Sequence, residues 1–211
     1  MTVTELRRYT LHPGRRDDLI ELFEREFVTG QQEAGIAVGG RYRELDDPDR
    51  FVWLRAFPDM AARLAGLRTF YGGPVWQAHR EQANATMRDS DDVLLLRGTL
   101  PPPPPTADVV TAVICHPADP GTFAAAVEQL VRPALGGRLL GTARTEHAVN
   151  DFPALPVRTG EDVFVWLTTA PAADAAAAVP PQHLLLREPQ LLRLAPVRAR
   201  HGGAGPDRQA G

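Results

Sequence analysis

Two short sequence patterns occur twice in this chain, in the same order, on either side of a run of five prolines. A His-Pro pair follows an alternating segment at His12 and again at His116, and the residues Phe-Val-Trp-Leu stand at 51–54 and again at 164–167. The prolines at 101–105 cannot join a helix or a central strand, because they lack a backbone N–H and form a stiff extended spacer. The sequence therefore predicts a duplicated unit, joined near the middle of its 211 residues.

Hydrophobic periodicity assigns the same order of elements to both halves, namely strand–helix–strand–strand–helix–strand. In the first half, strands are expected at 3–11, 35–45, 51–57 and 93–97, and helices at 16–28, from an Asp59 cap to about residue 70, and from Pro74 onward. In the second half, strands are expected at 109–115, 138–146, 162–169 and 191–197, with a helix at 120–135 and a shortened second helix within 170–188.

This order of elements folds into a four-stranded antiparallel sheet with both helices on one face, which leaves the other face uncovered. Two copies can cover each other. We therefore expect an α+β fold in which two ferredoxin-like βαββαβ repeats pack as a pseudo-dimeric α+β barrel. Along the strand at 51–57, we expect Val52, Leu54 and Ala56 to lie under the helices, and the space between the sheets to be faced by Phe51, Trp53, Arg55 and Phe57.

The predicted domain boundaries follow from the duplication. The first repeat covers 1–99, a polyproline linker 100–107, the second and diverged repeat 108–197, and a disordered tail 198–211. His12 and Trp53 are 41 residues apart, whereas the equivalent His116 and Trp166 are 50 apart, so the second repeat holds about nine extra residues there. Because the duplication can complete a barrel within one chain, both a monomer with an internal pseudo-dimer and a homodimer remain open.

The composition excludes several classes of chemistry. All 23 basic residues are arginine, Ser90 is the one serine and Cys115 is the one cysteine. A chain without lysine has no amine for a Schiff base, and a single cysteine forms neither an internal disulfide nor a four-cysteine zinc site. The formal charge of −3 argues against nucleic-acid binding, and no run of 18 apolar residues is present to span a membrane. The N-terminal residues lack the apolar segment of a secretory signal, so we expect a cytoplasmic protein.

The first half resembles a known family through five segments. They are 5–14, 45–55, 70–80, 83–87 and 89–97, which read ELRRYTLHPG, LDDPDRFVWLR, FYGGPVWQAHR, ANATM and DSDDVLLLR. Over residues 3–97 the chain resembles the NIPSNAP family, and the second half resembles it only through its repeated motifs. The resemblance implies the dimeric α+β barrel superfamily, which includes antibiotic-biosynthesis monooxygenases, polyketide cyclases, haem-dependent chlorite dismutase relatives and simple binding proteins. It carries over a fold and a pocket, but no catalytic motif.

The densest group of aromatic residues surrounds the helix that begins at Pro74. Its members, which share one helix face or directly precede it, are Phe70, Tyr71, Trp76, His79, Ala83 and Met87. This face can roof a pocket for a flat apolar ligand, with His79 as acid, base or haem ligand. The alternative is that this helix face only packs against the rest of the protein, with His79 hydrogen-bonded to a neighbouring group. The segment has no counterpart in the second half, which favours one pocket per chain.

Arg55 is expected beside Trp53 in the space between the sheets, and a buried arginine needs an anion or several acceptors. Its partner is either a substrate carboxylate or phenolate, or an internal glutamate, for which Glu5 and Glu44 are the candidates. Tyr9 shares a strand face with Glu5 and can offer its hydroxyl to the same space.

His12 is a second candidate base, because it stands at a strand-to-helix junction. The alternative is that it orders the turn. The six histidines form no His-x-His or His-x3-His pair, so no metal site is predicted. No cofactor is predicted, with haem as an alternative.

Three functional hypotheses follow. In the first, the protein binds a small aromatic or apolar molecule in one barrel pocket through Tyr9, Trp53, Arg55, Phe70, Tyr71, Trp76 and His79. In the second, it is a cofactor-independent monooxygenase or cyclase-like tailoring enzyme of secondary metabolism, in which His79 or His12 deprotonates an aromatic substrate and Arg55 stabilises the anion. In the third, it is an interaction protein whose barrel holds no ligand.

Overall fold

The structure, a computed structural model, describes residues 2–198, so the predicted tail lies outside the described residues from position 199 on. The first half comprises β1 (Val3–Leu11), α1 (Arg16–Leu22), a π-helical segment (Phe23–Phe27), α2 (Val28–Glu33), β2 (Ala37–Glu44), β3 (Arg50–Phe57), α3 (Met60–Gly72), α4 (Pro74–Asn84), β4 (Met87–Asp89) and β5 (Val93–Thr99). The second half comprises β6 (Val110–Cys115), α5 (Pro120–Ala126), a π-helical segment (Val127–Val131), α6 (Arg132–Leu135), a 3-10 turn (Gly136–Arg138), β7 (Leu139–Thr145), β8 (Phe164–Thr168), α7 (Ala172–Ala177), a second 3-10 turn (Gln182–Leu184) and β9 (Gln190–Pro196).

Local sequence signals set the helix boundaries. The Asp59 carboxylate accepts a 2.8 Å hydrogen bond from the Ala62 N–H and so caps α3, as predicted. Pro74 is the first residue of α4, where a missing N–H costs nothing. In the second half Asp119 caps α5 in the same way, accepting from the Thr122 N–H at 2.7 Å.

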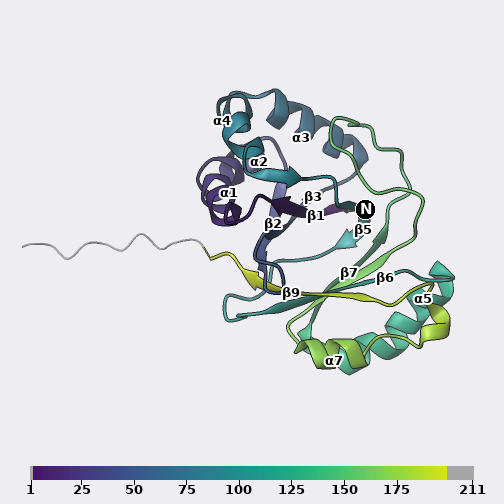
Figure 1. Cartoon of the computed structure of the whole chain (residues 1–211). Helices are drawn as coiled ribbons and strands as arrows, with labels where there is room; N and C mark the ends of the chain where they lie inside the picture. Colours follow the sequence, from purple (N-terminus) through teal and green to yellow (C-terminus); the bar gives the residue numbers. More distant parts are fainter. Residues whose placement is uncertain (1, 199–211) are drawn as a thin grey trace, which may run out of the picture.

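The strands form one closed antiparallel barrel (Figure 1). Within each half the strand order is that of a ferredoxin-like repeat, β5-β1-β3-β2 in the first and β9-β6-β8-β7 in the second. The two sheets join edge to edge, because β2 pairs with β9 and β5 pairs with β7. Eight strands therefore close the barrel, while the short β4 pairs with β1 outside it. The predicted α+β barrel of two repeats is confirmed.

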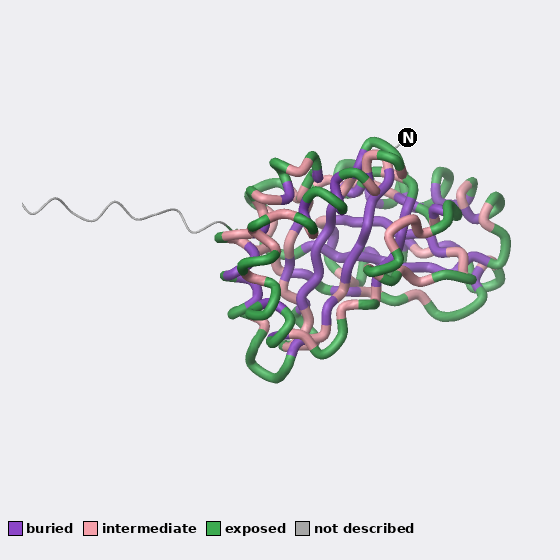
Figure 2. Tube along the Cα trace, turned by 90° about the horizontal axis from the view of Figure 1, so that it is seen from above, coloured by how far each residue is buried: buried purple, intermediate pink, exposed green. Residues whose placement is uncertain are grey.

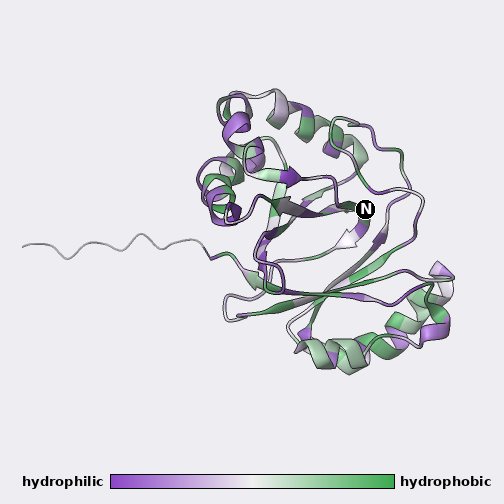
Figure 3. Cartoon of the chain, viewed as in Figure 1, coloured by the Kyte–Doolittle hydropathy of each residue, from purple (hydrophilic) through white to green (hydrophobic). Residues whose placement is uncertain are grey.

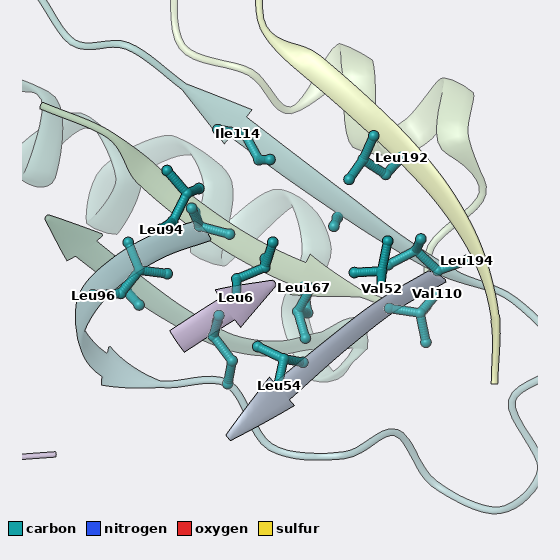
Figure 4. Packing of buried hydrophobic residues seen from close by; sticks show 14 of the residues in the cluster. Leu6, Val52, Leu54, Leu94, Leu96, Val110, Ile114, Leu167, Leu192 and Leu194 are labelled. Atoms are coloured by element: carbon teal, nitrogen blue, oxygen red, sulfur yellow. The ribbon is translucent and has the colours of Figure 1, made fainter. Parts of the chain in front are cut away.

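The barrel interior is filled mainly by aliphatic side chains from both halves, among them Leu6, Val52, Leu54, Leu167 and Leu192 (Figure 4). Trp53, Phe51 and Phe57 instead lie outside the barrel, under the helices of the first half. The predicted facing of the 51–57 strand is therefore wrong, since its two faces are interchanged. The physical reason is space: side chains fill the interior of an eight-stranded barrel, and here aliphatic residues and Tyr42 fill it, so the larger side chains of β3 lie between the sheet and the helices.

The two helix layers differ in size and character. In the second half the predicted shortening is confirmed, because only the six-residue α7 and a 3-10 turn replace the long α3–α4 pair. The helix α7 is mostly apolar, whereas α1 and α4 mix apolar and hydrophilic residues (Figure 3). The buried strands run through the centre of the molecule and the more exposed helices surround them (Figure 2).

The extra residues of the second repeat form a long connection between β7 and β8, at 146–163. This connection does not stay on its own half. It lies beside α3 of the first half (Figure 1), where Phe152 and Leu155 pack against the aromatic core of that half. We call residues 146–163 the crossing loop. The second repeat thereby contributes to the site described next.

Candidate ligand-binding site

A cavity of about 230 Å³ lies between the outer face of β1 and β3 and the helices of the first half. Five of its lining residues are those predicted as ligand-binding, namely Tyr9, Trp53, Phe70, Tyr71 and Trp76. The π-helical segment adds Phe23 and Phe27. We call this space the aromatic cavity. The rings in its walls pack edge to face, as Phe23 and Trp53 do at a centroid distance of 4.7 Å. This packing holds the wall residues in place around the cavity.

Two polar atoms of the cavity walls are buried without a hydrogen-bond partner. They are Trp53 Nε1, a donor, and Gln31 Oε1, an acceptor. The amide nitrogen of Gln31 is satisfied, because it donates to the Phe27 carbonyl at 3.3 Å. Such atoms are uncommon in native cores, since an unpaired buried group costs about 1–3 kcal/mol. Because both residues line the cavity, a ligand there lies near one unpaired donor and one unpaired acceptor.

A buried ionic cluster adjoins the cavity. The Glu5 carboxylate binds three guanidinium groups, with Arg7 Nη1 at 2.6 Å, Arg55 Nε at 2.7 Å and Arg63 Nε at 2.7 Å. All four side chains are fully or almost fully buried. We call these residues the arginine cluster. Burial alone would raise the pKa of Glu5, but Arg55, Arg7 and Arg63 together hold that pKa far below its ordinary value.

Two hydroxyl groups connect the cluster to the cavity. Tyr9 accepts a hydrogen bond from Arg7 Nε at 2.9 Å, and Tyr71 accepts one from Arg55 Nη1 at 3.3 Å. Burial raises the pKa of Tyr9, and Arg7 opposes this only in part. Tyr9 is therefore a neutral phenol at physiological pH, and its own proton remains available for donation.

The crossing loop closes the site from the second repeat. Arg63 Nη1 donates to Asp151 at 2.9 Å and to Asn150 at 3.1 Å. The Phe152 ring lies 5.9 Å from that of Tyr71, and Leu155 lines the aromatic cavity. Sequence reasoning missed these residues. The available signal was the extra length before the second Phe-Val-Trp-Leu motif, but spacing alone could not say which half the additional residues contact.

The structure does not bring the predicted catalytic residues together. His79 is not among the lining residues, and its Nε2 lies 3.5 Å from the Glu26 carboxylate at the surface of the helix layer. His12 is exposed in the turn after β1. Arg55 is buried behind the cavity, where it contacts Glu5 rather than the barrel interior in which it was predicted. Of the two glutamates proposed as its partner, Glu5 is the one it binds, while Glu44 binds Arg8.

Within residues 2–198, no group of three or more His, Cys, Asp or Glu side chains is placed to hold a metal ion. In the same part of the chain, no helix combines the length and apolar character that crossing a bilayer requires.

The fold and the site can be compared with those of known proteins. A family model described as NIPSNAP matches residues 4–98, which is the repeat that holds the aromatic cavity. The first half of the chain is a NIPSNAP domain. The match runs from β1 to within one residue of the end of β5, so it covers one βαββαβ repeat. None of the curated proteins with which the chain was compared is significantly similar to it.

Some solved structures resemble the molecule over nearly its whole length. A candidate monooxygenase from Fusobacterium nucleatum is 7% identical, with 93% of each chain covered and a TM-score of 0.63. A candidate monooxygenase from Lactobacillus acidophilus is 10% identical, covers 92% of this chain and 93% of its own, and has a TM-score of 0.59. An anthrone oxidase-like protein is 12% identical, with 93% and 92% covered and a TM-score of 0.59. At these identities the likeness shows the tandem barrel fold.

Proposed function

We propose that the NIPSNAP domain binds one small, flat aromatic molecule in the aromatic cavity. The observation that supports this most is the coincidence of an open space with two unpartnered buried polar atoms, Trp53 Nε1 and Gln31 Oε1, in its walls. A ligand with one acceptor and one donor would recover the free energy that these atoms lose by burial. The edges and faces of the surrounding rings favour an aromatic guest.

The volume of the cavity limits the size of the ligand. An apolar cavity of about 150 Å³ holds benzene. The aromatic cavity, at about 230 Å³, therefore accommodates a substituted single ring or two fused rings. A larger ligand would require the crossing loop to move, because Leu155 forms part of the wall.

Isothermal titration calorimetry with naphthol tests this proposal. Wild-type protein is expected to bind it saturably. Ala83→Leu is expected to abolish binding, because Ala83 is a buried wall residue and the larger side chain would occupy the space. Gln31→Leu is expected to weaken binding, whereas Gln32→Leu, on the exposed side of the same helix, serves as the matched control. Absence of naphthol binding to wild type, or equal binding by Ala83→Leu, would overturn the proposal.

Oxidation of the bound aromatic is the second candidate function. The names of the whole-chain structural neighbours, two candidate monooxygenases and an anthrone oxidase-like protein, favour it. Against it, the described lining of the cavity contains no imidazole or carboxylate, so a bound substrate has no adjacent protein base. A tailoring role in secondary metabolism belongs to this candidate alone.

An oxygen electrode distinguishes the two candidates. Oxygen consumption with naphthol that is lost in Ala83→Leu, in which the larger side chain fills the cavity, would support an oxidation that takes place in the aromatic cavity. Naphthol binding without oxygen consumption would leave binding as the function.

A further inference from the structure

The arginine cluster carries more positive than negative charge. Arg7, Arg55 and Arg63 are at most 1% exposed, yet Glu5 is the one fully buried carboxylate that faces them. Asp151, the other acid bound to the cluster, is 29% exposed and belongs to the crossing loop. Even with both acids counted, guanidinium groups outnumber carboxylates. Surplus buried charge of one sign is costly unless a counter-charge can approach it.

Tyr9 and Tyr71 connect the arginine cluster to the aromatic cavity through hydrogen bonds. Each hydroxyl accepts a hydrogen bond from an arginine of the cluster, and both residues line the cavity. A phenol whose oxygen accepts from a guanidinium group is a stronger donor of its own proton, because the cation draws electron density from the oxygen. Among the described hydrogen bonds neither hydroxyl donates. The unpartnered indole N–H of Trp53 is a third donor in the same walls.

Two guanidinium groups of the arginine cluster also lie close to the Trp53 ring. The guanidinium carbons of Arg7 and Arg55 lie 5.7 Å and 5.3 Å from the Trp53 ring centroid. A ligand in contact with Trp53 is therefore within short range of two buried cations, and water screens little of their field. Glu5 and Asp151 offset part of that field but not all of it.

We propose that this side of the aromatic cavity binds an anionic oxygen of the ligand, so that the ligand class is a phenolate, an enolate or an aryl carboxylate rather than a neutral arene. The inference rests on the proposed function, because it assigns the charge of the molecule bound there. Tyr9 and Trp53 donate to the anionic oxygen, and the arginine cluster stabilises its charge. The same arrangement would lower the pKa of a bound phenol, so no protein base is required to bind it as an anion.

An indicator phenol tests the inference directly. Para-nitrophenol absorbs differently as phenol and phenolate, so its ionisation can be followed in the complex. We expect the pKa of the bound phenol to be lower than that of the free phenol by about one unit or more, which corresponds to about a tenfold preference for the anion. Nitrobenzene, a neutral molecule of nearly the same shape, is expected to bind at least about tenfold more weakly than the phenolate.

Tyrosine variants test whether the hydroxyl groups of Tyr9 and Tyr71 cause the pKa shift of the bound phenol. Tyr9→Phe keeps the ring and removes the donor, so the pKa of the bound nitrophenol is expected to return toward its free value. Tyr71→Phe gives a second, independent measurement if Tyr9→Phe does not fold by circular dichroism. Tyr42→Phe is the matched control, because Tyr42 is a buried tyrosine of the barrel interior, apart from the cavity.

The outcomes separate this inference from the proposed function. Equal binding of nitrobenzene and nitrophenolate, or an unshifted pKa of the bound phenol, would overturn the inference and leave aromatic binding intact. Failure of both probes to bind would overturn both. A shifted pKa that Tyr9→Phe and Tyr71→Phe leave unchanged would also contradict it, because the donors would then lie elsewhere.

Discussion

Glu5 is the residue on which the buried charges of the NIPSNAP domain depend. It stands in the middle of β1, and its two oxygens bind arginines from β1, β3 and α3. The alternation of side chains along β1 and β3 places Glu5, Arg7 and Arg55 on one face, and Arg63 completes the group from the helix above. Without its carboxylate, three guanidinium groups would be buried with only Asp151 as a counter-ion.

Glu5→Gln is therefore expected to destabilise the protein strongly. Removing one partner from a buried ionic cluster leaves uncompensated charge and typically costs about 3–5 kcal/mol. Glu24→Gln is the matched control, because the Glu24–Arg41 pair is partly exposed and is expected to contribute less than about 1 kcal/mol. Urea denaturation followed by circular dichroism measures both. A loss of stability no larger for Glu5→Gln than for Glu24→Gln would contradict the role given to Glu5.

The same group predicts a pH dependence. The pKa of Glu5 is lower in the folded than in the unfolded protein, where it has its ordinary value of about 4.5. Its contribution to stability is therefore complete above that value and decreases as the pH falls toward the folded-state pKa. Below pH 4.5, Glu5→Gln should lose less of its remaining stability with falling pH than the wild type does.

At the scale of secondary-structure elements, the crossing loop and the strand seams connect the two repeats. The crossing loop places Asp151 on Arg63 and Leu155 in the cavity wall. The seam between β5 and β7 brings backbones so close that Gly98, with φ +141°, faces the Thr142 carbonyl at a distance that leaves no room for a Cβ. Neither feature is recognisable from one repeat alone.

Asp151→Asn is expected to loosen the crossing loop and open the cavity. The variant removes the charge that binds Arg63, so acrylamide should quench tryptophan fluorescence more efficiently than in the wild type. Asp162→Asn changes an acid of the same loop that pairs with the exposed His147, and serves as control. Equal quenching in both variants would show that the Asp151–Arg63 contact does not hold the loop closed.

Gly98→Ala is expected to destabilise the seam. The added Cβ would lie 2.5 Å from the Thr142 carbonyl oxygen, and the backbone is in a region that disfavours side chains. The cost should be at least about 1–3 kcal/mol in urea denaturation. Gly137→Ala is the matched control, since nothing lies within 4 Å of its added Cβ. Similar stabilities of the two variants would contradict the close approach at this seam.

At the scale of the whole molecule, the duplication was readable from the sequence and the barrel followed from it. Repeated motifs and strand periodicity predicted two βαββαβ units, because local hydrophobic patterns survive divergence. Trp53, Phe70 and Trp76 line a cavity, but the sequence placed their pocket in the barrel, whereas the cavity lies between the sheet and the helices. The facing of β3 was predicted wrongly, since alternation gives two faces but not which one the helices cover. The crossing loop could not be placed, because its partners are on the other repeat.

A fragment of residues 1–99 is expected to self-associate. It would expose Leu6, Val52 and Leu54, which the second repeat covers in the barrel interior, and leave β2 and β5 without partners. Size-exclusion chromatography with light scattering should show a dimer or larger species. Addition of residues 108–198 should restore a complex of one copy of each. A stable, monomeric fragment would contradict the interdependence of the two repeats.

The account as a whole depends on an aromatic ligand in contact with Trp53. The chain has three tryptophans, of which Trp53 and Trp76 line the cavity and Trp166 packs under the helices of the second repeat. Their indole N–H protons give separate NMR signals that Trp→Phe variants assign. On titration with naphthol, we expect the Trp53 signal to move downfield as it gains an acceptor, the Trp76 signal to shift through the ring current, and the Trp166 signal to stay unchanged. An unchanged Trp53 signal in the presence of saturating naphthol would contradict the account.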